Sequence, residues 1–122
     1  MVDALLEYSE NSLTSSFTIK EANLFVEGSR FTEPGIVENM AQTVALHTGY
    51  SYFLKGEKAP TGYIGSIKYV SINHLPKCGD TIVTTANILH EFNGVTMVDV
   101  VLKLNTVEIA SGQMKTVIAQ AP

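Results

Sequence analysis

The sequence contains very little cysteine, arginine or tryptophan. Cys78 is the one cysteine among 122 residues, so the chain cannot form an internal disulfide, and tryptophan is absent. Arg30 is the one arginine and the formal net charge is -4, so the sequence lacks the basic stripe that binding to a phosphate backbone requires. We therefore expect a protein of a reducing, cytoplasmic compartment that does not bind nucleic acid.

Long apolar runs are also missing. No run approaches the roughly 20 residues that cross a bilayer, and residues 1–7 lack the basic region and apolar stretch of a signal peptide. The sequence therefore predicts no membrane span. With 45% hydrophobic residues and no internal repeat, residues 1–122 are expected to form a single domain with a substantial core.

The pattern of apolar and turn-forming residues predicts one long helix among several strands. Apolar residues recur at helical spacing from Pro34 to about Phe53, whereas residues 21–33 show no sustained period and are predicted to be a loop. Asn93-Gly94 is a hairpin signal. The predicted strands are 5–8, 12–20, 63–72, 81–92, 95–104 and 108–119. This order indicates an α+β fold in which an antiparallel sheet curls around one helix.

Glu38 is the most informative residue of the predicted helix. The helix is apolar around most of its circumference, which is typical of a buried helix, and a buried carboxylate needs a partner or a function. Gln42 lies one turn further along the same face. His47 is nine residues after Glu38 and falls on the opposite side, in a polar arc with Asn39, Thr43 and Tyr50.

No other motif for chemistry accompanies this helix. The sequence has no Gly-x-Gly-x-x-Gly, no phosphate-binding Gly-Lys-Ser/Thr, no Gly-x-Ser-x-Gly, no Cys-x-x-Cys and no histidines at metal-ligand spacing. We therefore expect neither a cofactor nor a metal ion.

The helix and the strand after it resemble a known family. The run Pro34-Gly35-Ile36-Val37-Glu38-Asn39-Met40-Ala41-Gln42 resembles the central-helix signature of hot-dog fold 3-hydroxyacyl carrier-protein dehydratases, in which a glutamate is followed by an Ala-Gln step. The run Gly62 to Lys68 and the pair Gly79-Asp80 resemble the long strand and the Gly-Asp turn of the same family, so the similarity covers most of the chain.

Within that family, the sequence resembles the dehydratase-like proteins of aryl polyene and related polyketide-type pathways. These relatives commonly carry a Pro-His-Arg-x-Pro-Phe-like block ahead of a Val-Asp pair such as Val2-Asp3. A segment before Met1 and a natural start at Met1 are both compatible with the sequence. The resemblance implies a hot-dog fold and an acyl thioester substrate, on acyl carrier protein or on coenzyme A.

The resemblance also implies roles for particular residues. Dehydration of a 3-hydroxyacyl thioester needs a base, an acid and stabilisation of the thioester oxygen. Glu38 would exchange a proton with the hydroxyl group, and Gln42 would orient Glu38 or bind the hydroxyl. Gly35 and Ile36, at the helix start, and Gly65, in a strand, would bind substrate. The structural alternatives are a buried ion pair for Glu38, close packing for Gly35 and a β-bulge for Gly65.

The sequence departs from the family at the catalytic histidine. Active relatives carry a Gly-His-Phe-Pro-like segment before the helix, whereas residues 28–33 here read Gly-Ser-Arg-Phe-Thr-Glu. The three histidines, His47, His74 and His90, do not match that position. Three hypotheses follow: a dehydratase with an unrecognised base, an acyl thioesterase, or a non-catalytic acyl-binding subunit that partners a histidine-bearing homologue. Independently of these hypotheses, a sheet wrapped on one helix leaves exposed strand edges, so we expect a homodimer, or a heterodimer with a related hot-dog subunit.

Overall fold

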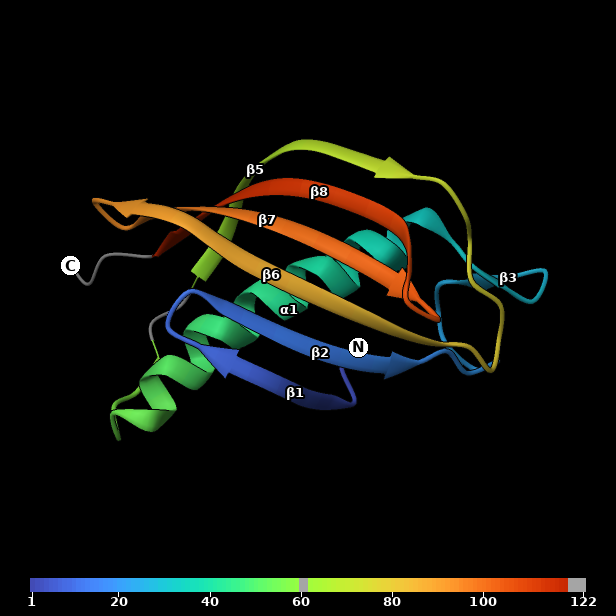
Figure 1. Cartoon of the computed structure of the whole chain (residues 1–122), viewed down its shortest axis with the longest axis horizontal. Helices are drawn as coiled ribbons and strands as arrows, with labels where there is room; N and C mark the ends of the chain where they lie inside the picture. Colours follow the sequence, from blue (N-terminus) through green and yellow to red (C-terminus); the bar gives the residue numbers. More distant parts are fainter. Residues whose placement is uncertain (60–61, 119–122) are drawn as a thin grey trace.

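One curved antiparallel sheet and one long helix make up the fold (Figure 1). The computed structural model describes residues 1–59 and 62–118. Six strands form the sheet in the order β1-β2-β6-β7-β8-β5, so β1 and β5 are its edges. Their bounds are β1 Ala4–Ser9, β2 Ser12–Thr18, β5 Gly62–Ile72, β6 Thr81–Phe92, β7 Val95–Leu104 and β8 Val107–Ile118. The predicted strands match closely, except that residue 119 lies outside the described residues.

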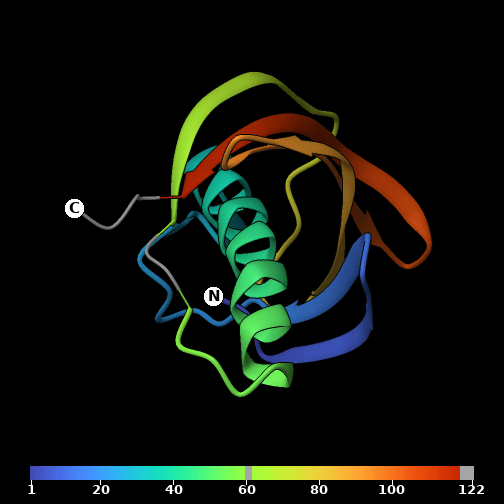
Figure 2. The same cartoon turned by 90° about the vertical axis from the view of Figure 1, so that its left-hand side faces the viewer.

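The sheet wraps one side of helix α1, Glu33–Leu54 (Figure 2). Completely buried apolar side chains from α1, β6, β7 and β8 meet between the two layers, among them Met40, Ile82, Val100 and Met114. Inward-facing residues alternate with outward-facing ones along β2, β6 and β7, as expected when only one face of a sheet packs on the core. The hot-dog arrangement is thereby confirmed.

The local sequence explains where α1 begins. Thr32 has the extended backbone of an N-cap residue, and Pro34 occupies the first turn, where its missing N–H costs no hydrogen bond. The Thr32 hydroxyl does not cap the helix but donates to the carbonyl oxygen of Phe25, at 2.6 Å. This bond fixes the helix start against the segment that precedes it.

The prediction of a structureless loop over residues 21–33 is wrong in part. Two short strands, β3 (Val26–Glu27) and β4 (Arg30–Phe31), pair there as a small hairpin. Gly28 and Ser29 turn the chain with positive φ angles of 56° and 67°, which two-residue hairpin turns require at both central positions. Such short strands carry no periodic pattern that a sequence can reveal.

The prediction that α1 is buried around most of its circumference is also wrong for the single chain. One face, which includes Ile36, Asn39, Met40 and Thr43, is completely buried against the sheet, whereas Glu38 and Gln42, on the far side, are half-buried and Ala45 is exposed. His47 lies opposite Glu38, as predicted, but the polar arc to which it belongs faces the interior. The apolar composition of the helix did not reveal which side would be covered.

Candidate functional site

Glu38 and Gln42 form a hydrogen-bonded pair on the outward face of α1. The Gln42 side-chain amide donates to Glu38 Oε1 at 3.0 Å, across one helical turn. Both side chains are half-buried. The predicted neighbourhood of these two residues is therefore present, and because Nε2 is turned toward the carboxylate, Gln42 restricts the orientation of Glu38.

Gln42 also contacts the first residue of the chain. Its Oε1 atom accepts a hydrogen bond from the Met1 amino group, while the carbonyl oxygen of Met1 accepts one from Asn39 Nδ2 at 2.9 Å. Two side chains of α1 therefore bind Met1, one through its amino group and the other through its carbonyl oxygen. This contact could not be predicted from the sequence, since no local pattern connects residues about forty positions apart.

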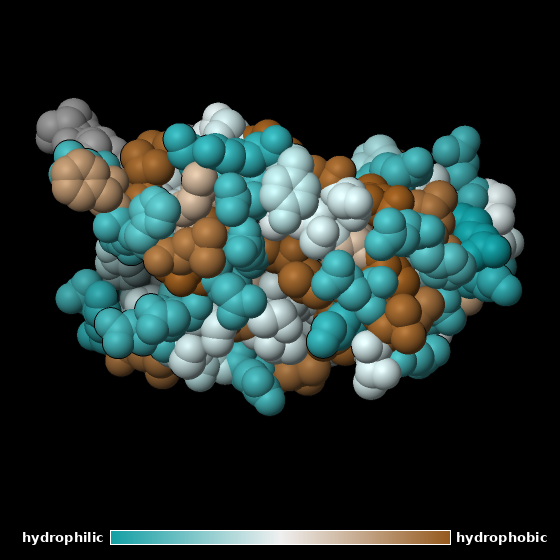
Figure 3. Space-filling view, turned by 45° about the horizontal axis from the view of Figure 1, so that its top comes forward, coloured by the Kyte–Doolittle hydropathy of each residue, from teal (hydrophilic) through white to brown (hydrophobic). Residues whose placement is uncertain are grey.

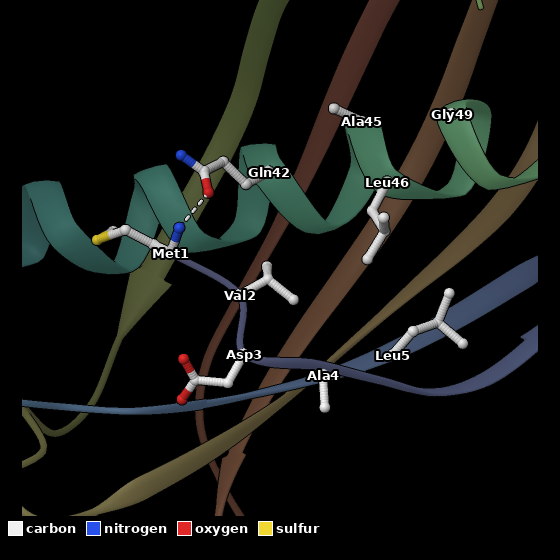
Figure 4. A pocket seen from close by; sticks show the side chains of 9 residues that line it. All are labelled: Met1, Val2, Asp3, Ala4, Leu5, Gln42, Ala45, Leu46 and Gly49. Carbon is white, nitrogen blue, oxygen red and sulfur yellow. Dashed lines mark hydrogen bonds between the residues drawn. The ribbon is translucent and has the colours of Figure 1, made fainter.

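A largely apolar cavity of about 540 Å³ opens beside this pair (Figure 4). Residues 1–5 form one wall, and Gln42, Ala45, Leu46 and Gly49 of α1 form the other. Its volume lies within the roughly 300–1,000 Å³ that is typical of small-molecule sites. The cavity can therefore take a flexible apolar group that extends away from Glu38.

Gly35 and Ile36 have packing contacts in this structure. A Cβ atom on Gly35 would lie 2.6 Å from ring atoms of Phe31 and 2.8 Å from the Cβ of Phe25. Any larger residue at position 35 would therefore clash with these two side chains. The Ile36 side chain is completely buried in the core. These contacts support the packing alternative for Gly35 and leave no exposed Ile36 surface for a substrate.

Gly65 lies in a β-bulge of strand β5. The pairing register with β8 shifts between Ile64 and Ser66, and a Cβ atom on Gly65 would lie 2.8 Å from Val117 Cγ2. The bulge and close strand contact that were the structural alternative for this glycine are thus observed.

The three histidines lie in two different places. His47 is 9% exposed, stacks on Tyr8 with 5.3 Å between ring centroids, and its Nε2 lies 3.1 Å from the carbonyl oxygen of Ser9. His47 and His90 both line a polar cavity near the end of α1. His74 is exposed and shares a different cavity, near the helix start, with Arg30 and Glu33.

A buried polar network, which the sequence analysis did not identify, lies beneath α1. Thr84 Oγ1 donates to Asn39 Oδ1 at 2.6 Å, and the Thr43 hydroxyl lies 2.8 Å from both Ser15 Oγ and the Asn39 carbonyl oxygen. Across residues 1–59 and 62–118, every buried side-chain nitrogen or oxygen has a hydrogen-bond partner. The same residues contain no group of three or more potential metal ligands and no helix long and apolar enough to cross a membrane.

The chain is similar to one protein family and to several solved structures of the same fold. A family model described as ApeP dehydratase, ApeP-like, matches residues 1–121, while no curated protein matches the sequence. A chain of the dehydratase heterocomplex ApeI:P of Xenorhabdus doucetiae superposes with a TM-score of 0.88 at 14% identity, covering 98% of this chain and 82% of that one.

Other similar structures are named as thioesterases or degradation proteins. A hypothetical thioesterase of Streptococcus pneumoniae TIGR4, solved with coenzyme A, has a TM-score of 0.79 at 7% identity over 95% of this chain and 84% of that one. The PaaI protein of the E. coli phenylacetic acid degradation operon has a TM-score of 0.75 at 10% identity, covering 97% and 80%. At such identities these likenesses establish the fold alone.

Proposed function

The chain belongs to the ApeP-like dehydratase family, and from this premise we propose that it holds a 3-hydroxyacyl thioester against the outward face of α1 and takes part in removing water from it. One observation carries the proposal: Gln42, which donates a hydrogen bond to Glu38 one helical turn away, lines a largely apolar cavity on the same helix face. An acid next to a space for an acyl chain is the combination that this reaction needs.

Glu38 is assigned the role of the acid. As the base removes the proton from the carbon beside the thioester carbonyl, the carbon–oxygen bond to the hydroxyl breaks, and protonated Glu38 donates its proton so that water leaves. Gln42 Nε2 donates a hydrogen bond to Oε1 of Glu38, so the proton is assigned to the other carboxyl oxygen, Oε2. The backbone N–H groups of the first turn of α1, near Gly35, are assigned to the thioester oxygen, where the positive end of the helix dipole favours developing negative charge.

The base is assigned to a partner subunit. His47 is buried, its Nε2 atom lies within hydrogen-bond distance of the Ser9 carbonyl oxygen, and its ring stacks on Tyr8. His74 shares its cavity with Glu33, which is five residues and therefore about 140° around the helix from Glu38. Since neither histidine faces Glu38 within the chain, we assign the base to the histidine of a related hot-dog subunit. The named ApeI:P heterocomplex among the similar structures supports such a pairing.

Strand β5 offers the edge for such a partner. It is one of the two edge strands of the sheet, and residues 65–69 are all exposed, including Ile67 at 45% and Tyr69 at 50%. An unpaired strand edge with exposed apolar side chains is a template for pairing with another chain. On the face shown in Figure 3, apolar side chains are interspersed with polar ones. Such a mixed composition is typical of non-obligate protein–protein interfaces.

The decisive experiment measures dehydration of a 3-hydroxyacyl thioester by this protein alone, by a histidine-bearing hot-dog partner alone, and by their mixture. We expect activity that depends on both subunits. Glu38→Gln, which keeps the shape but cannot supply the proton, should lower kcat in the mixture by roughly 10²–10⁴-fold. Equal rates for wild type and Glu38→Gln would remove Glu38 from the mechanism.

The role of His74 has a matched test. His90→Gln is the control, because His90 is also exposed but lies at the other end of α1. Both His74→Gln and His90→Gln should change kcat by less than about twofold, since neither histidine faces Glu38. A loss of about 10²-fold for His74→Gln alone, the size expected for a missing base, would place the base within this chain.

Thioester hydrolysis is the second candidate. It is favoured by one observation, the Glu38 carboxylate without a neighbouring histidine, because a lone carboxylate can activate water. Release of free thiol from saturated acyl thioesters, lost in Glu38→Gln, would identify it. Neither reaction needs a cofactor, and the reducing, cytoplasmic setting remains a prediction from the single cysteine.

A further inference from the structure

The wall that residues 1–5 form is held firmly although its first three residues belong to no strand. Beside the two contacts of Met1 with α1, the Asp3 amide donates to the Ser16 carbonyl oxygen at 2.8 Å, and Asp3 Oδ2 accepts from the Thr18 amide at 2.7 Å. The Asp3 carboxylate is therefore occupied by β2. Figure 4 shows this segment facing Gln42 and Leu46 across the cavity.

The opposite wall is made of residues whose size controls how deep the cavity is. At Gly49 an added Cβ atom would meet nothing within 4 Å, so the glycine borders open space. Ala45 adds only a methyl group, and Leu46 is half-buried with its side chain turned toward the residues 1–5 wall (Figure 4). The cavity is therefore bordered by a bulky side chain at position 46 and by a glycine, which has no side chain, at position 49.

These positions lie in line with Glu38. With 3.6 residues per turn, Glu38, Gln42, Ala45 and Gly49 fall within an arc of about 60° on the helix, and Gly49 lies about 16 Å along the axis from Glu38. A chain whose thioester is held at Glu38 and which runs toward the end of α1 passes Gln42 and then lies between Leu46 and Gly49.

We propose that Leu46 and Gly49 determine the length of the acyl chain that the protein accepts. The inference rests on the proposed function, because it takes the reacting end of the substrate to lie at Glu38. A side chain at position 49 would occupy the space that the far end of a long chain needs, whereas a shorter side chain at position 46 would enlarge it.

The test uses a homologous series of straight-chain 3-hydroxyacyl thioesters with the complete complex of this protein and its partner. Gly49→Leu should lower kcat/KM by about tenfold or more for the longest chains, since several methylenes lose their buried site, and should leave the shortest chain unchanged. Leu46→Ala should shift the preference toward longer chains. Gly49→Ala, which adds one carbon, should give a smaller shift than Gly49→Leu.

Ser51→Leu is the matched control. It adds a similar apolar group about 200° around the helix from Gly49, beside the polar cavity that His47 lines, and should leave the chain-length profile unchanged. Light scattering on each variant identifies any change of assembly. Gly49→Leu and Leu46→Ala profiles that match wild type, or that shift in the same direction, overturn the inference.

Binding measurements separate the inference from the proposed function. Calorimetric titration with saturated acyl thioesters, which cannot be dehydrated, reports chain-length preference without turnover. If binding follows the predicted shifts but no dehydration occurs, the reaction is wrong and the length determinants stand. If dehydration depends on Glu38 but neither binding nor turnover responds to positions 46 and 49, the acyl chain lies elsewhere.

Discussion

The two faces of α1 both carry polar side chains, yet these are satisfied in different ways. On the sheet side, Asn39 and Thr43 are completely buried; they hydrogen-bond to Thr84 of β6 and Ser15 of β2, and Asn39 Nδ2 also donates to the Met1 carbonyl oxygen. On the outward side, Glu38 and Gln42 are half-buried and are held by each other and by Met1. Saturated polar groups in the interior specify packing, whereas a carboxylate with a free oxygen beside a cavity is available for chemistry.

The largest expected effect on stability is on the sheet side. Met40 is completely buried, so Met40→Ala should lower the free energy of unfolding by about 2–5 kcal/mol, because it removes packed atoms and leaves a cavity. Chemical denaturation measures this. Activity per folded molecule should remain close to wild type, and a large loss of kcat in folded protein would contradict the division between the two faces.

Gln42→Leu should have the next largest effect, on activity. It removes the hydrogen bond to the Glu38 carboxylate, and bonds to charged groups contribute about 1.5–3 kcal/mol, so kcat should fall roughly 10- to 100-fold. Because the role is one of positioning, KM for the shortest substrate should change little. A change confined to KM would instead assign Gln42 to substrate binding.

Asn39→Ala should destabilise the protein by about 1–3 kcal/mol, since it leaves the buried Thr84 hydroxyl without its acceptor. Thr84→Val in the same background tests the explanation. If the pair interacts as the structure shows, the double variant should be less destabilised than the sum of the two single variants, by about 0.5 kcal/mol or more. Strict additivity would mean that the bond contributes nothing.

Gly49→Ala should have the smallest effect and the opposite sign. An alanine fits without contact in the middle of the helix, so the free energy of unfolding should rise by up to about 1 kcal/mol. Thermal unfolding checks this. Destabilisation would show that another group already fills the space beside Gly49, which would also undermine the proposed cavity.

The features that were predicted correctly from the sequence are local ones. Asn93-Gly94 predicted a hairpin, and both residues have the positive φ angles that it requires. The Pro34 start, the alternation along β6 and β7 and the one-turn spacing of Glu38 and Gln42 were likewise local and therefore readable. Asn105-Thr106 also turns the chain with positive φ angles, of 50° and 68°, although it contains no glycine.

Only part of the candidate site could be predicted from the sequence. Residue types and helix spacing determined that an acid and an amide share one helix face, and the resemblance to a known family implied the hot-dog fold. Only the tertiary structure decided that Asn39 rather than Glu38 faces the sheet, that Met1 contacts Gln42, and that Leu46 and Gly49 border a cavity. These features depend on contacts between segments far apart in sequence, and such contacts arise when the helix and sheet pack, not from any local pattern.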